Sequence, residues 1–175
     1  MAEGKVAWII GGGSGIGAAV AQKLADAGWR VAISGRRVEK LEAVAEGRDI
    51  KPFGLDVTDS DAVVRVIGEL VDTYGRIDLT LFGAAAWQPR RVGDYALEPF
   101  SKIVDTNFMG VIRVANPLFA QARQAGRRTV CRDCIRCRLL WPAPFRRLLR
   151  HQSRVDQFAR DYARRALRLE ISLCR

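Results

Sequence analysis

The sequence predicts an α/β fold in which a parallel sheet lies between two layers of helices. Short apolar runs with the length of buried strands alternate along residues 1–126 with segments of helical periodicity. A glycine-rich turn also separates the first of these runs from the first helical segment. This alternation is typical of successive β-α-β units, because parallel strands need a crossover that a helix usually supplies.

The first β-α-β unit occupies residues 5–37, which read KVAWIIGGGSGIGAAVAQKLADAGWRVAISGRR. Its β-branched run Val6–Ile10 predicts a buried strand, and the glycine-rich turn follows at residues 11–17. Apolar residues then recur at helical spacing as far as Gly28, where we expect the helix to end. Residues 31–34 predict the second strand.

A glycine-rich turn between a strand and a helix suits a dinucleotide pyrophosphate. Glycines let backbone N–H groups approach a phosphate closely, and the helix N-terminus adds partial positive charge. A turn that serves packing alone is the alternative, but the strand, turn, helix and second strand occur in order within the roughly 30 residues that such a unit needs. The candidate cofactor-binding residues are Gly11, Gly13, Ser14, Gly15, Ile16 and Gly17.

The spacing of this turn resembles that of the short-chain dehydrogenase/reductase family. Gly11, three further residues and then Gly15-Ile16-Gly17 match the family's G-x-x-x-G-I-G. The resemblance implies a Rossmann-type three-layer α/β/α fold and NAD(P)-dependent hydride transfer between a small-molecule carbonyl and an alcohol. One position departs from the pattern, since Ile10 stands where the family usually has a threonine whose hydroxyl braces the turn.

The end of the second strand predicts NADP as the cofactor rather than NAD. In such folds this point reaches the adenosine ribose, where an acid binds both hydroxyls and a basic residue pairs with a 2′-phosphate. Gly35 occupies the place of the acid, and Arg36 and Arg37 follow it. Two arginines that only solvate a surface loop are the alternative.

Two more strands follow, separated by helices. We expect a short helix over residues 38–46, a third strand over 50–55, an amphipathic helix over 62–74 and a fourth strand over 79–82. The resemblance assigns Asp56 and Val57, which close the third strand, to the adenine ring. Taken alone, Asp56 is equally consistent with a capping or turn residue, as we expect for Thr58, Asp59 and Ser60.

The fourth strand ends in a sequence unlike that of the family. Family members have N-N-A-G here, whose asparagine amides help to hold the sheet and wall the cofactor site, whereas this chain has FGAA at residues 82–85. Ala84 remains the candidate cofactor contact. Each lost hydrogen bond is worth about 0.5–1.5 kcal/mol, so we expect weaker cofactor binding.

A long helical pattern covers residues 99–125. The family has an asparagine followed three residues later by glycine in this helix, and the asparagine's backbone carbonyl holds a water of the proton relay. Asn107 and Gly110 match this spacing, which makes Asn107 the catalytic candidate. Both residues are poor helix formers, so a local kink is also predicted.

The last part of the chain, residues 127–175, has a different composition. Its 14 basic residues are all arginine and face four acidic ones, so this tail carries the whole net charge of +10. We therefore predict a boundary near Gly126, with a cofactor-binding domain over residues 1–126 and a fold that is complete only through about the fourth strand and the following helix.

The tail lacks the family's catalytic residues. The family next has a strand ending in Ser, then a Tyr with a Lys four residues later, which steady the substrate carbonyl and transfer its proton. Tyr162 is instead followed four residues later by Ala166, and the tail contains no lysine. We therefore expect little or no turnover from the chain as written.

The abrupt change in composition suggests the hypothesis that the reading frame is shifted near Arg127. Read one base later, codons chosen for residues 133–153 can spell a family-like peptide. It places Ser, Tyr and Lys in the positions of Ile135, Leu148 and Gln152. Such a tail was not selected to fold, although residues 153–169 have one apolar helical face.

Two other interpretations of the tail remain open. The spacing C-x2-C-x2-C at residues 131–137, with Cys174 or His151, suits zinc or an iron–sulfur cluster, but incidental thiols are favoured because no second C-x2-C exists, and no metal site is predicted. The arginines suit nucleic-acid phosphates, yet no recognition element accompanies them. A non-catalytic dinucleotide-binding or basic nucleic-acid-binding protein is thus the alternative function.

No apolar run of the sequence reaches the length of a membrane span, and its start lacks the layout of a signal peptide. We therefore expect a cytoplasmic protein without a membrane partner. Family members pair through helices that include the one beginning near Pro99, so a homo-oligomer is an open expectation.

Overall fold

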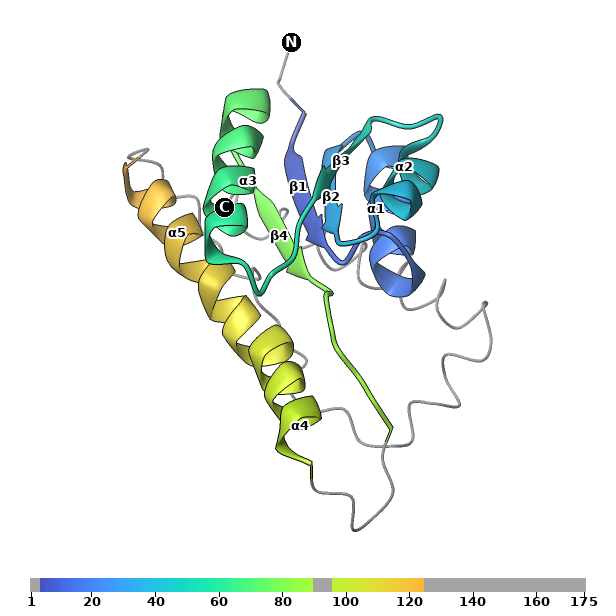
Figure 1. The fold of residues 1–175 in the computed structure, drawn as a ribbon. Coiled ribbons are helices and arrows are strands. Elements are labelled where there is room, and N and C mark those ends of the chain that lie inside the picture. The colour runs from blue at the N-terminus through green and yellow to red at the C-terminus, as the bar shows by residue number, and fades with distance from the viewer. Residues whose placement is uncertain (1–3, 90–95, 125–175) are drawn as a thin grey trace, which may run out of the picture.

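The computed structural model describes residues 4–89 and 96–124 of the 175-residue chain. In this part, four parallel strands form one sheet in the order β3-β2-β1-β4 (Figure 1). The strands are β1 (Val6–Ile10), β2 (Arg30–Gly35), β3 (Ile50–Gly54) and β4 (Leu79–Phe82). The predicted α/β fold with a parallel sheet is confirmed.

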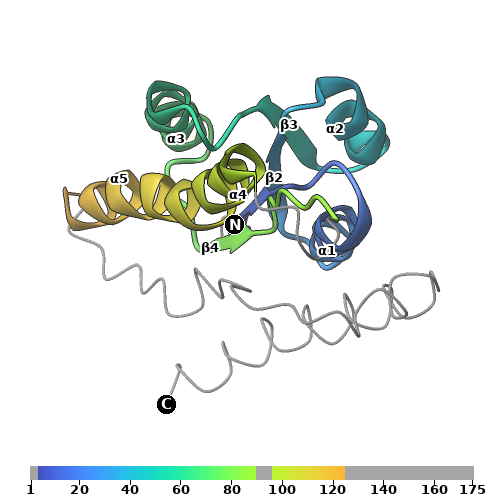
Figure 2. The same ribbon diagram turned by 60° about the horizontal axis from the view of Figure 1, so that its bottom comes forward.

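Helices cover both faces of this sheet, as the turned view in Figure 2 shows. One face packs against α1 (Gly15–Asp26) and α2 (Val38–Ala45). The other face packs against α3 (Ser60–Tyr74) and α5 (Gly110–Gln124). The three-layer arrangement follows from β1, whose five residues are all buried and alternate between the two faces.

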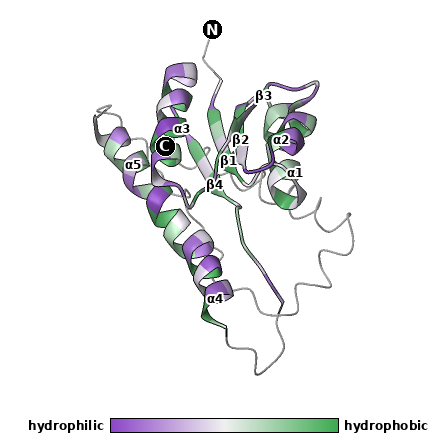
Figure 3. Ribbon diagram, viewed as in Figure 1, coloured by the Kyte–Doolittle hydropathy of each residue, from purple (hydrophilic) through white to green (hydrophobic). Residues whose placement is uncertain are grey.

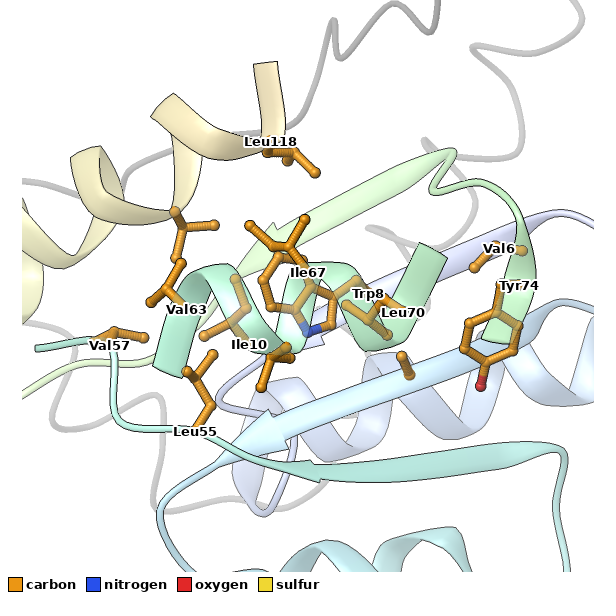
Figure 4. Close-up of a cluster of buried hydrophobic side chains, with 13 residues drawn as sticks. Val6, Trp8, Ile10, Leu55, Val57, Val63, Ile67, Leu70, Tyr74 and Leu118 are labelled. Atoms are coloured by element: carbon orange, nitrogen blue, oxygen red, sulfur yellow. The ribbon is translucent and has the colours of Figure 1, made fainter. Parts of the chain in front are cut away.

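Two apolar cores lie on either side of β1. Trp8 and Ile10 point into the core beneath α3 and α5, which Figure 4 shows in close-up. Ala7 and Ile9 point into the core beneath α1 and α2. Hydrophobic residues accordingly concentrate along the strands, while the helices carry both kinds of residue (Figure 3).

The ends of the elements agree with the sequence to within two residues. The third strand ends at Gly54 rather than at residue 55, and α3 begins at Ser60 rather than at residue 62. The earlier start of α3 has a local cause, because Asp59 Oδ1 accepts hydrogen bonds from the N–H groups of Asp61 and Ala62, each at 3.0 Å. Gly28 follows α1 with a φ of +83°, as expected for a residue that ends a helix.

The long helical segment near the end of the described chain comprises three parts. These are α4 (Leu97–Val104), the π-helical turn η1 (Asp105–Met109) and α5. The helix begins two residues earlier than expected. Pro99 is tolerated in its first turn, since the N–H that proline lacks would have no partner within the helix there.

At the position of the expected kink, the structure has this π-helical turn, and Val104 before it and Gly110 after it keep helical backbone angles. Gly110 follows the π-helical turn and packs closely on the loop after β3. A Cβ on Gly110 would lie 2.9 Å from Val57 Cγ2. Arg113 spans the turn, since its guanidinium donates to Asp105 Oδ1 at 2.6 Å and to the Asp105 carbonyl at 3.3 Å. Close packing and a bridging ion pair therefore accompany the wider turn.

Among the helices that the structure describes, no segment combines the length and the apolar character needed to cross a bilayer.

Candidate dinucleotide-binding site

The glycine turn lies at the carboxyl end of β1, where the strand order changes direction. β1 pairs with β2 on one side and with β4 on the other, so the strand order changes direction at β1: β2 and β3 follow on one side of it, and β4 lies on the other. In open α/β sheets, ligands bind in the crevice at such a switch point. The topology therefore puts the turn in the position where a nucleotide can bind.

Two glycines let the turn pack closely against its surroundings. Gly11 has a φ of +83°, and a Cβ there would lie 2.6 Å from both Ala84 N and Gly83 C. A Cβ on Gly17 would lie 2.2 Å from the Gly11 carbonyl oxygen. Helix α1 and the segment after β4 thus both contact the turn, and no side chain fits at either position.

The other side of the turn is open. Gly15 begins α1 with a φ of +57°, is exposed, and has room for a Cβ with no heavy atom within 4 Å. Ser14 is the exposed N-cap residue, its side chain makes no capping hydrogen bond in the described structure, and the first turn of α1 contains no acid. The first N–H groups of a helix lack intrahelical partners, so they and the Ser14 hydroxyl suit an anion.

The remaining two turn candidates face inward. A Cβ on Gly13 would lie 3.3 Å from Leu41 Cδ2 of α2, and Ile16 packs against the core beneath α1. Their contribution is to shape the turn and to anchor α1 at its first residues.

Arg36 and Arg37 follow β2 with exposed side chains. Arg37 is the N-cap residue of α2, and its carbonyl accepts hydrogen bonds from the N–H groups of Lys40 at 3.2 Å and Leu41 at 3.3 Å. Arg36 lies close enough to Asp56 for its charge to affect that carboxyl group. The structure thus brings Arg36 and Asp56, which are 20 positions apart in the sequence, to one edge of the sheet.

Asp56 forms a local turn with Thr58. Its Oδ1 accepts hydrogen bonds from Thr58 N at 3.0 Å and from Thr58 Oγ1 at 2.8 Å. Partial burial raises the pKa of Asp56, but the two Thr58 hydrogen bonds and the Arg36 charge outweigh it and lower the pKa below its usual value. Asp56 therefore has the role of a turn residue that the sequence left open. The adjacent Val57 is buried against Gly110.

Phe82 and Gly83 stand where the family has asparagines, and both make other contacts. Phe82 packs against the core beneath α3 and α5. The Gly83 N–H donates to the Ile10 carbonyl at 2.7 Å, which fastens β4 to the end of β1. Backbone and apolar contacts thus join β4 to its neighbours without the two amides.

Asn107 fastens the segment that follows Ala84. Its Oδ1 accepts from Ala86 N at 2.7 Å, and its Nδ2 donates to Ala86 O at 2.9 Å. An amide side chain offers one acceptor and paired donors, so it can bind both backbone groups of a single residue. The sequence indicated a backbone role for Asn107, and this side-chain role was not predicted.

A second unpredicted contact lies directly behind the turn. Trp8 Nε1 donates to Ser34 Oγ at 2.8 Å, and both residues are 0% exposed. The available signal was a single tryptophan in β1 and a single serine in β2, each next to an aliphatic residue. A buried indole N–H usually finds a partner, but the sequence alone does not say which one.

The expectations for the tail fall outside the described residues. This applies to the cysteines at 131–137, to the positions of Ile135, Leu148 and Gln152, to the helical face over 153–169 and to the boundary near Gly126. Within residues 4–89 and 96–124, no group of three or more His, Cys, Asp or Glu side chains is placed to hold a metal ion.

A parallel sheet with an open helix N-terminus and a close-packed glycine turn at its switch point defines a Rossmann-type α/β protein. The model of the short chain dehydrogenase family matches residues 5–128. The chain belongs to this family, whose members are NAD(P)-dependent oxidoreductases.

Individual relatives agree with this assignment. The chain is 31% identical over 127 residues to an uncharacterized oxidoreductase of Staphylococcus haemolyticus (strain JCSC1435), a match that covers 71% of this chain and 55% of the relative. A short chain dehydrogenase from Bacillus anthracis superposes with a TM-score of 0.67 at 26% identity, over 71% of this chain and 52% of that one.

A variant of actinorhodin polyketide ketoreductase, solved with NADPH, superposes with a TM-score of 0.64 at 26% identity, over 70% of this chain and 48% of that one. The chain therefore spans about half the length of the proteins that it matches.

Proposed function

We propose that this chain binds NADP(H) at the glycine turn and represents the cofactor-binding half of a carbonyl/alcohol oxidoreductase. The open N-terminus of α1 carries the proposal. Ser14 and Gly15 are exposed there, the first turn of α1 contains no acid that would repel an anion, and the close contacts of Gly11 and Gly17 fix the turn behind them. A pyrophosphate bound at this point would accept hydrogen bonds from N–H groups that the helix leaves unpaired.

The preference for NADP is supported by the charges near the end of β2. Arg36 and Arg37 are exposed, and position 35, where an acid would favour NAD, is a glycine. The proximity of Arg36 to Asp56 puts a cation beside the loop that the family resemblance assigns to adenine. A cation at this edge favours a cofactor with a 2′-phosphate, because charge-assisted hydrogen bonds to phosphate are strong.

The proposed activity concerns a small-molecule carbonyl or alcohol, and in this chain it is impaired. Asn107 is the candidate member of the proton relay, through its backbone carbonyl. The sequence after residue 126 contains no lysine to complete a Tyr-x-x-x-Lys pair. Without a positioned proton donor, bound NADPH has no acid to complete reduction of a carbonyl, so binding without turnover is expected.

Titration of the full chain with NADPH and with NADH tests this proposal. We expect saturable binding of NADPH, with a Kd at least several times lower than that for NADH. Equal affinities would contradict the NADP preference alone. No binding of either cofactor, by a chain whose far-UV circular dichroism shows a folded α/β protein, would contradict the function itself.

A further inference from the structure

We propose that Ser34 and Trp8 are positioning residues for the glycine turn. In this proposal, the buried hydrogen bond between their side chains fixes the carbonyl group that holds the first two glycines of the turn. The inference rests on the proposed function only for its effect on cofactor affinity. The arrangement itself comes from contacts among the described residues.

The Ser34 carbonyl determines where the turn begins. It accepts hydrogen bonds from Gly11 N at 2.6 Å and from Gly12 N at 3.2 Å, so two successive amides share one acceptor. Gly11 also packs on the backbone after β4, where a Cβ would lie 2.6 Å from Ala84 N. A shift of this single oxygen would therefore move the turn against a neighbour that leaves it no room.

The Ser34 side chain is held in turn by Trp8. The distance from Trp8 Nε1 to Ser34 Oγ is 2.8 Å, and neither residue is accessible to solvent. An indole N–H can only donate, so the serine hydroxyl must accept from it. Breaking the bond would leave a buried donor without a partner, which keeps Ser34 in place at the carboxyl end of β2.

The sheet makes this bond possible through its register. Ser34 lies opposite Ile10, whereas Trp8 lies opposite Ala32 in β2 and opposite Thr80 in β4. Both neighbours of Trp8, Ala32 and Thr80, have small side chains. The indole of Trp8 lies beneath α3 (Figure 4). The indole thus reaches diagonally along the same face of the sheet to the residue beside the turn.

The end of β1 supplies no such support. Ile10, the last residue before the turn, is 1% exposed and lies in the core beneath α3 with a side chain that cannot form hydrogen bonds. A threonine here would place a hydroxyl next to the turn. In this chain the nearest buried hydroxyl on the neighbouring strand is that of Ser34, which is why the proposal assigns the bracing to it.

Amide hydrogen exchange by NMR tests the proposal without any cofactor. We expect Ser34→Ala and Trp8→Phe each to accelerate exchange of the Gly11 and Gly12 amides about tenfold relative to other amides of the sheet. Each should also raise the Kd for NADPH about three- to tenfold. Ser34→Thr retains the hydroxyl and should retain both properties.

The matched control is Thr80→Val. Thr80 Oγ1 is also buried next to Trp8 but has no hydrogen-bond partner in the described structure, so its loss should change neither glycine exchange nor affinity. The double variant Trp8→Phe/Ser34→Ala should accelerate glycine exchange and raise the Kd for NADPH no more than either single change does, because both changes remove the same hydrogen bond.

Unchanged exchange at Gly11 and Gly12 in both single variants would overturn the proposal. So would a uniform acceleration across the sheet that Ser34→Thr does not correct, since that pattern describes a merely structural role. Faster glycine exchange in a chain that never binds NADPH would support the positioning role and contradict the proposed function. If Ser34→Ala does not fold, Trp8→Phe and Ser34→Thr decide between these outcomes.

Discussion

The choice of cofactor depends on single exposed side chains at the end of β2. The lowered pKa of Asp56 means that this carboxyl group is ionised at neutral pH and can only accept hydrogen bonds. Arg36 contributes to that lowering and also offers its own donors to solvent. Arg36 therefore adds to the stabilisation of the ionised Asp56, after the two Thr58 hydrogen bonds, and its exposed side chain remains accessible to a phosphate.

Replacing Arg36 by serine should weaken NADPH binding selectively. We expect Arg36→Ser to raise the Kd for NADPH about five- to tenfold and to leave that for NADH nearly unchanged, since only NADPH carries the extra phosphate. Arg65→Ser is the control, because Arg65 is an exposed arginine of α3 that pairs only with Glu69 among the described contacts. An equal rise in the Kd for NADPH and for NADH would show that Arg36 does not contact the 2′-phosphate.

At the scale of the elements, the contact between α1 and the turn allows no side chain at Gly17. We expect Gly17→Ala to lower the free energy of unfolding by about 2 kcal/mol, because its Cβ would lie 2.2 Å from the Gly11 carbonyl oxygen. Gly68→Ala in α3 should instead raise that free energy by up to about 1 kcal/mol, since a Cβ there meets nothing within 4 Å. Urea denaturation of both variants measures the difference.

Two hydrogen bonds join the Asn107 side chain to the Ala86 backbone, and we call this pair the Asn107 clamp. It leads to a prediction about how stability depends on pH. In Asn107→Asp, an ionised carboxylate would face the Ala86 carbonyl oxygen, which now accepts a hydrogen bond at 2.9 Å. The folded-state pKa of this new acid should therefore lie above its unfolded value of about 3.9. Stabilisation by the protonated acid is complete below the unfolded pKa and is lost as the pH rises through the folded one.

Urea denaturation of Asn107→Asp at pH 4 and pH 7 measures this effect. We expect the destabilisation relative to the parent chain, about 2 kcal/mol at pH 7, to shrink at pH 4. Asn107→Ala is the control, because it removes the same bonds without adding a titratable group. A pH dependence shared by both variants would mean that the clamp does not cause it.

For the molecule as a whole, periodicity in the sequence was enough to predict the α/β class and the succession of strands and helices. The strand Val6–Ile10 and the glycine turn are local signals, and both were found where expected. Contacts between distant residues were not predictable: the bonds of Trp8 to Ser34 and of Asn107 to Ala86 depend on the register of the sheet and on a wider helical turn. The sequence shows which type of group a buried donor or acceptor needs as a partner, but not which residue supplies that group.

The reading-frame hypothesis also belongs to this scale. We expect the coding DNA across codons 120–175 to continue, in a neighbouring frame, with Ser, Tyr and Lys in the positions of Ile135, Leu148 and Gln152. Correcting the frame should then give a chain that oxidises NADPH in the presence of a carbonyl substrate. If no frame contains these residues, the tail is a genuine divergence, and a corrected gene cannot be built.

The clamp at Asn107 also links two places that are 21 positions apart in the sequence, because it joins Ala86, after β4, to η1, after α4. The entropy of closing a flexible loop grows slowly, by about 0.6 kcal/mol for each doubling of its length. Inserting a few glycines and serines between residues 89 and 96 should therefore shift the urea midpoint little, and a large shift would show that the segment itself carries stability. Because the Asn107 clamp joins the chain on both sides of residues 90–95, we expect the nucleotide end of the sheet to stay constant when the number of residues between 89 and 96 changes.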